Sequence, residues 1–168
     1  TRRAKGDFAI TTTAAANVTE FGRVWEGEMG VWGDHQLPGL TKMATQLNSA
    51  GTISLVQLFH GGMRAPRSIN GVQPVSASEN TESGMNGEFT HAMSPDEVRE
   101  MIQSFTKAAI RCEQAGFHGV ELHGAHSYLI CQFLGAKTNR RTDEWGGDIA
   151  GRLSLIHISE PTRQPCIA

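Results

Sequence analysis

The stretch Gly119-Val-Glu-Leu-His-Gly-Ala-His-Ser-Tyr128, continued by Leu129-Ile-Cys-Gln-Phe-Leu134, decides the fold that this sequence predicts. Its first five residues have the composition of a buried strand, and residues 128–134 indicate a short helix. Two histidines and a tyrosine lie between them. A strand that passes through a short polar loop into a helix is the repeating unit of α/β proteins.

The segments before this stretch extend the same alternation. Residues 8–12 predict a short buried strand, and the unbroken apolar run 53–59 predicts a strand covered on both faces. A helix is indicated between them by apolar residues at helical spacing, which are Leu40, Met43, Ala44 and Leu47. A second helix begins at the capping box Ser94-x-x-Glu97 and ends at Gly116.

This order of elements predicts an α/β protein with parallel strands. No G-x-G-x-x-G motif follows a strand, which counts against a dinucleotide-binding Rossmann sheet. Two strands end in histidine- and glycine-rich loops, at 60–62 and 123–126. Because TIM barrels gather their active sites at the carboxyl ends of the strands, we expect a TIM barrel in preference to a doubly wound sheet.

Composition excludes several functions. The chain has 168 residues and a net charge of −2, and its scattered lysines and arginines form no patch for nucleic acid or for an anionic membrane. No apolar run approaches the roughly 20 residues that span a bilayer. The three cysteines have no C-x-x-C spacing. We therefore expect reduced thiols and a cytoplasmic location, without nucleic-acid or membrane partners.

The residues after the strand at 119–123 can carry chemistry. His123 and His126 can direct two N–H donors at one carbonyl oxygen, as an oxyanion hole does, and Tyr128 can deliver a proton. A zinc site is the rival interpretation and would need a third ligand. Side chains of the right type exist, but no recognised spacing links them; they are His60, Glu121 and Asp143. A purely structural role for the histidines, in helix capping or a polar loop network, also stays open.

Gln57 is the one polar residue in the apolar run 53–59. A buried amide needs hydrogen-bond partners, since leaving it unpaired costs about 1–3 kcal/mol. Those partners are either neighbouring backbone groups or a ligand with both donors and acceptors, such as the edge of a flavin.

Taken together, three segments resemble the Old Yellow Enzyme family, with similarity over about residues 5–152. Residues 115–134 resemble its fourth strand and active-site loop, 139–147 (NRRTDEWGG) the signature that follows, and 56–62 its third strand. The resemblance implies an FMN-dependent TIM barrel that reduces activated C=C bonds in small molecules with NADH or NADPH. It is compatible with a homo-oligomer of the full-length parent.

The resemblance also implies roles for individual residues. His123 and His126 would hold the substrate's electron-withdrawing oxygen over the flavin, and Tyr128 would protonate the carbon next to that group. Gln57 would hydrogen-bond the flavin ring, and Thr13 lies near a backbone contact to the flavin. The presence of Tyr128 beside both histidines favours a simple ene-reductase over the related dienoyl-CoA reductases.

One position departs from the family pattern. A common form has arginine where Met63 stands, so the adjacent Arg64 receives no role from the resemblance.

We expect residues 1–152 to form an incomplete (β/α)8 TIM-barrel domain for FMN, with about strands 2 to 4 and their helices. Residues 153–168 resemble a translated sequencing-library adapter, so we treat them as a non-native tail and give His157 and Cys166 no function. The sequence is then either part of an ene-reductase or an inactive truncated fragment. A metal-dependent TIM-barrel hydrolase is a further alternative.

Overall fold

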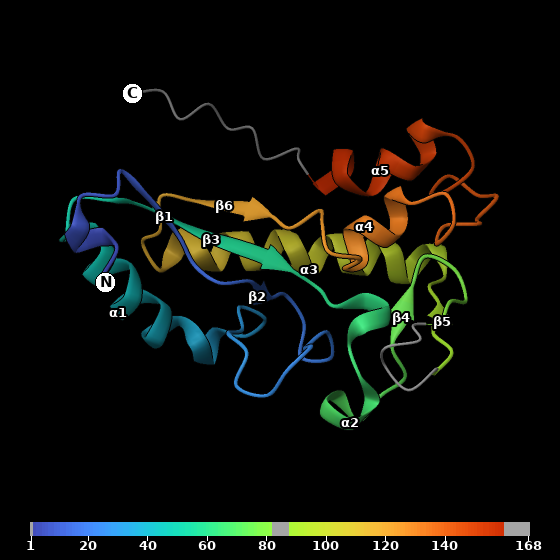
Figure 1. Ribbon diagram of the computed structural model, residues 1–168, viewed down its shortest axis with the longest axis horizontal. Coiled ribbons are helices and arrows are strands. Elements are labelled where there is room, and N and C mark those ends of the chain that lie inside the picture. The colour runs from blue at the N-terminus through green and yellow to red at the C-terminus, as the bar shows by residue number, and fades with distance from the viewer. Residues whose placement is uncertain (1, 82–87, 160–168) are drawn as a thin grey trace.

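The computed structural model describes residues 2–81 and 88–159 (Figure 1). Its strands are β1 (Ile10–Thr12), β2 (Ala16–Asn17), β3 (Ile53–Phe59), β4 (Val75–Ser76), β5 (His91–Ala92) and β6 (Gly119–Leu122). Its α-helices are α1 (Leu37–Asn48), α2 (Arg67–Asn70), α3 (Pro95–Gln114), α4 (Leu129–Leu134) and α5 (Ile149–Ser159). Single 3-10 turns occupy Ala4–Gly6, Asp34–Gln36 and Gly62–Arg64.

The main sheet is parallel and is built around β3. Leu55 pairs with Thr12 of β1 and with Gly119 of β6, and Leu58 pairs with Ala16 of β2 and with Leu122 of β6. Since one residue can pair with only two neighbours, on opposite edges, β1 and β2 share one edge of β3 and β6 takes the other. The described sheet therefore contains three consecutive parallel strand positions, the first of them interrupted between β1 and β2. The predicted parallel α/β arrangement is confirmed.

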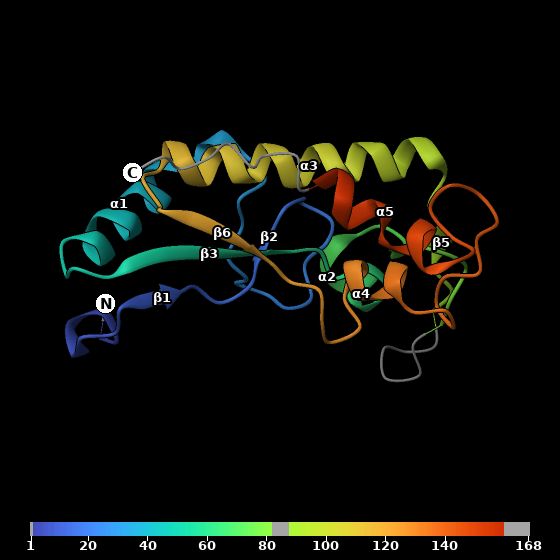
Figure 2. The same ribbon diagram turned by 90° about the horizontal axis from the view of Figure 1, so that it is seen from above.

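Helices α1 and α3 cover one face of this sheet, and the other face is open (Figure 2). Along β3, Ser54, Val56 and Leu58 are buried, whereas Ile53 on the alternate face is 47% exposed. Ile10 in β1 is 54% exposed. The expectations of a strand at 53–59 covered on both faces and of a buried strand at 8–12 are therefore wrong, because no described segment packs on the open face.

The capping box that was predicted for α3 is present. Ser94 Oγ accepts a hydrogen bond from the Glu97 backbone N–H, and a Glu97 carboxylate oxygen accepts one from the Ser94 N–H. The helix runs to Gln114, and Gly116 follows with φ of +91°, a conformation that glycine adopts readily. The local sequence signals at both ends of the helix were sufficient to place it.

The segment between β3 and α3 contains secondary structure of its own. It holds α2 and a two-stranded parallel sheet in which Val75 of β4 pairs with His91 of β5. Two-residue strands are too short to show a hydrophobic period, so neither could be predicted from the sequence.

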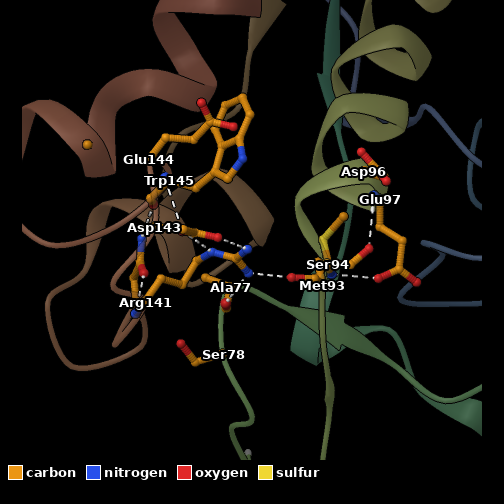
Figure 3. A network of polar contacts seen from close by, with 12 residues as sticks. Ala77, Ser78, Met93, Ser94, Asp96, Glu97, Arg141, Asp143, Glu144 and Trp145 are labelled. Carbon is orange, nitrogen blue, oxygen red and sulfur yellow. Dashed lines mark hydrogen bonds and ion pairs between the residues drawn. The ribbon is translucent and has the colours of Figure 1, made fainter.

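Arg141 fixes this segment to the loop that follows α4 (Figure 3). Its guanidinium donates to the backbone oxygens of Ala77 and Met93 and to both carboxylate oxygens of Asp143. Hydrogen bonding from Arg141 is the main reason that the pKa of Asp143 lies below its ordinary value. These hydrogen bonds therefore hold the loop at 139–147 against the segment between β3 and α3.

Helix α5 packs against α3 and α4, and it includes residues 153–159 of the stretch interpreted as a non-native tail. Leu155 is buried in the core. Cys166 lies outside the described residues. The assignment of 153–168 as non-native stays a prediction.

Candidate active site

The open face of the sheet presents a row of polar side chains across all three strand positions. Gln57 and Glu121 are register partners in β3 and β6, and Gln57 Nε2 donates a hydrogen bond to Glu121 Oε1. Thr13, just past β1, accepts at Oγ1 from the Gln57 backbone N–H over 3.3 Å. The structure thus brings the two residues predicted to contact the flavin, Gln57 and Thr13, next to each other and adds Glu121.

At the carboxyl end of β3 the chain turns His60 inward. This side chain is 3% exposed, and its Nδ1 accepts from the Gly62 backbone N–H over 3.0 Å. Burial lowers the pKa of His60 to about 4, so the ring is neutral at physiological pH. His60 is therefore a buried, neutral side chain at the end of β3.

The loop after β6 brings His123, His126 and Tyr128 together, as the sequence predicted. The His123 and His126 ring centroids lie 5.0 Å apart, and the His123 and Tyr128 centroids also lie 5.0 Å apart. Phe59, at the end of β3, packs against the Tyr128 ring at 4.9 Å. The cluster lies at the carboxyl ends of two adjacent parallel strands.

Hydrogen bonds fix the tautomer of His123. Its Nδ1 accepts from the Ala125 backbone N–H, so the proton of the neutral ring is on Nε2. That Nε2–H faces His126 Nδ1 at 3.1 Å, which leaves the second N–H donor of the pair on His126 Nε2. Burial, followed by the charge of His126, lowers the pKa of His123, against an opposing contribution from Glu121. The Ala125 backbone N–H thus donates to His123, and His123 Nε2–H donates to His126. The Nε2–H of His126 is the last donor of this chain.

Two contributors to the site were missed by sequence reasoning. Arg64, which received no role, donates from Nη1 to the His126 carbonyl oxygen over 2.9 Å, and its Cζ lies 5.5 Å from the centre of the Tyr128 ring. Gln132 in α4 hydrogen-bonds to the loops after both β3 and β6. Its sequence signal was the same as that of Gln57, a single amide in an apolar run.

No metal cluster is apparent in the part of the chain that the structure describes: no three His, Cys, Asp or Glu side chains there group in a way that could hold an ion. Within the same residues, no helix combines the length and apolar character needed to cross a membrane.

Comparisons with known proteins place this geometry in context. The sequence model described as the NADH:flavin oxidoreductase / NADH oxidase family matches residues 1–157. A Bacillus subtilis protein named "Probable NADH-dependent flavin oxidoreductase YqiG" is 38% identical over 150 residues, which is 89% of this chain and 40% of that protein. The chain therefore spans less than half the length of this relative.

Two solved structures share the fold. The old yellow enzyme homologue from Zymomonas mobilis matches with a TM-score of 0.86 and 28% identity, over 93% of this chain and 46% of that one. A 2-naphthoyl-CoA reductase in complex with 2-naphthoyl-CoA matches with a TM-score of 0.89 and 31% identity, over 94% of this chain and 26% of that one. The described sheet and helices are thus part of a TIM barrel, as expected.

Proposed function

This chain belongs to the NADH:flavin oxidoreductase / NADH oxidase family, and on that premise we propose that the complete protein is an FMN-dependent ene-reductase that uses NADH or NADPH. The observation that carries the proposal is the grouping of His123, His126 and Tyr128 at the carboxyl end of β6. The chemistry that FMN supplies when bound is transfer of a hydride from the nicotinamide to the β carbon of an activated C=C bond.

The open face of the sheet fits a flavin. Gln57 and Glu121 offer amide and carboxylate groups there, and Thr13 lies beside Gln57. A flavin edge carries alternating donors and acceptors, so an amide that offers both is a suitable partner. In the proposal, Gln57 and Thr13 hold the cofactor, and Glu121 orients the Gln57 amide.

The histidines have the chemistry to bind the oxygen of the electron-withdrawing group. His126 is exposed and carries its free N–H on Nε2, while the Nε2–H of His123 points to His126. A substrate oxygen that displaces this contact would receive both donors. Neutral donors in a partly dry site stabilise the negative charge that develops on such an oxygen during hydride addition.

In the proposal, Tyr128 completes the reaction. Its ring is half-buried between Phe59 and His123, and its position next to both histidines suits delivery of the phenolic proton to the α carbon. The net result is addition of a hydride and a proton across the double bond.

The test is purification of the complete protein, followed by its absorption spectrum and its turnover of cyclohexenone with NADH and with NADPH. We expect a yellow protein with non-covalent FMN and nicotinamide oxidation that depends on the enone. A colourless protein that takes up no FMN on reconstitution would end the flavin proposal, and a yellow one inactive on every enone would end the ene-reductase proposal.

A second candidate is a reductase of unsaturated CoA thioesters. It is favoured by the similarity to the 2-naphthoyl-CoA reductase, the most identical of the two structures compared above. Parallel assays with an enone and with its enoyl-CoA counterpart separate the two, since a CoA reductase would prefer the thioester.

A further inference from the structure

Gln132 is 1% exposed, and both ends of its amide are fully used. Nε2 donates to the Ser127 carbonyl oxygen over 2.6 Å and to the Gly61 carbonyl oxygen over 3.3 Å. Oε1 accepts from the Met63 backbone N–H over 3.1 Å and from Ser76 Oγ over 2.9 Å. An amide has two donor hydrogens and two acceptor positions, so this side chain is saturated.

The bond to Ser127 acts on a strained part of the backbone. His126 and Ser127 have φ of 55° and 56°, so two consecutive non-glycine residues lie in the left-handed region. Such residues persist only where their surroundings hold them. The carbonyls of both are bound, that of His126 by Arg64 and that of Ser127 by Gln132. Tyr128 follows directly, so the direction of its side chain depends on this turn.

The remaining bonds of Gln132 connect that turn to the loop after β3. Gly61 and Met63 flank Gly62, whose own N–H is bound to His60. Arg64, which holds the His126 carbonyl, belongs to the same loop after β3. Gln132, which holds the Ser127 carbonyl, is itself hydrogen-bonded to that loop. The two loops of the candidate site are therefore joined through one buried side chain.

We propose that Gln132 is a positioning residue: it holds the left-handed His126–Ser127 turn and thereby sets the position of the Tyr128 hydroxyl and the His126 ring. This inference rests on the proposed ene-reductase function. It assigns to Gln132 no contact with substrate or cofactor.

The test uses the complete protein carrying Gln132→Leu, which preserves bulk and removes all four hydrogen bonds. We expect the enone-reducing step to slow roughly 10- to 100-fold, the size of effect that a small misplacement of a catalytic group produces. Flavin reduction by the nicotinamide should change little. Gln103→Leu, on the exposed side of α3, is the matched control and should retain full activity.

The second variant separates positioning from packing. Ser127→Gly permits the left-handed conformation without strain. In the Gln132→Leu background it should therefore recover much of the lost rate, which a double-mutant cycle with the two single variants measures.

Hydrogen exchange of the 124–129 peptide gives a readout that needs no turnover. The exchange should accelerate in Gln132→Leu and not in Gln103→Leu.

Gln132→Glu is a further variant, which tests the same role even if Gln132→Leu does not fold. When neutral, the glutamate carboxyl group retains one hydrogen-bond donor, whereas its carboxylate form would face two carbonyl oxygens. The enone-reducing rate of Gln132→Glu should therefore fall with rising pH more steeply than the rate of the parent. Equal slowing of both half-reactions, no recovery by Ser127→Gly and an unchanged pH profile would overturn the inference. Absence of enone turnover in the parent would instead refute the proposed function.

Discussion

Gln57 and Glu121 face each other across the β3–β6 pair, with Gln57 Nε2 hydrogen-bonded to Glu121 Oε1 over 2.5 Å. Gln57→Glu would place two carboxylates at directly opposed positions, where like charges destabilise a sheet. It would also remove a donor. Together these losses amount to about 1–2 kcal/mol, so we expect FMN to bind roughly 5- to 30-fold more weakly to the complete protein at pH 8.

Part of that affinity should return at pH 5.5, because one carboxyl of such a pair takes up a proton. Titration of the apoprotein followed by flavin fluorescence measures both values. Gln103→Glu adds the same charge on the exposed side of α3 and is the control. Wild-type affinity in Gln57→Glu at pH 8 would remove Gln57 from the cofactor site.

The histidine pair can be tested with phenolate-forming ligands, which resemble the charge that develops on the substrate oxygen. His123→Ala and His126→Ala should each weaken their binding by about 1.5–3 kcal/mol, or roughly 10- to 150-fold, the value of one hydrogen bond to a charged group. Spectral titration of the flavin measures this. His35→Ala, which alters an exposed histidine in the 3-10 turn before α1, should bind normally. Unchanged binding in both site variants would contradict the anion-holding role.

Tyr128→Phe should separate the two half-reactions. It removes only the phenolic hydroxyl, so enone reduction should slow by roughly 10²–10⁴-fold, the usual contribution of a general acid. Flavin reduction by NADH or NADPH needs no proton from Tyr128 and should be unaffected. Stopped-flow absorbance follows each step, and an equal loss in both would show that Tyr128 serves another purpose.

Glu28 makes stability depend on pH. Its side chain is 8% exposed, and burial raises its pKa from 4.5 to about 7, although one oxygen accepts from the Val24 N–H. A raised carboxyl pKa stabilises the folded state below pH 4.5, and this contribution is lost as pH rises towards 7. Glu28→Gln should therefore be more stable than the parent at pH 8, by up to about 2–3 kcal/mol, with no gain at pH 4.5.

Thermal unfolding of the complete protein at both pH values measures this difference. Glu113→Gln, on the exposed side of α3, controls for the loss of a negative charge. A stability gain of the same size at both pH values would show that charge burial at Glu28 is not the cause.

A polypeptide of these 168 residues alone should neither bind FMN tightly nor catalyse turnover. Phe8, Ile10 and Ile53 are 58%, 54% and 47% exposed, and β6 has no strand partner on its outer edge among the described residues. Closing a TIM barrel takes eight strands, and whole domains have only about 5–15 kcal/mol of stability to lose. The measurement is thermal unfolding with and without FMN. A cooperative transition that FMN shifts upward would contradict this expectation.

Local signals explain which features could be predicted from the sequence. The strand at 53–59 and the helix beginning at Ser94 were placed correctly, since an apolar run and a capping box are encoded in adjacent residues. The grouping of His123, His126 and Tyr128 followed from their spacing after a strand. Their mutual orientation did not, because the left-handed turn that sets it depends on residues far away in the chain, Arg64 among them.

The features that could not be predicted from the sequence include contacts between segments far apart in the chain and strands too short to show a pattern. Which face of β3 is covered depends on the segments that pack there, and the strands of the small β4–β5 sheet are too short to carry a pattern. Gln132 was visible as a lone amide in an apolar helix, yet its four partners come from three other segments. Sequence reasoning could therefore mark it as unusual but could not say what it binds.

The close approach of Gly62 to Gln132 has a consequence for how relatives of this protein can diverge. A Cβ atom at position 62 would lie 2.4 Å from Gln132 Oε1, and Gly62 has φ of +61°. A side chain at position 62 would thus have to displace the amide at 132. We therefore expect a side chain at position 62 only in relatives whose residue 132 leaves room for it, whereas a change at 132 requires no change at position 62.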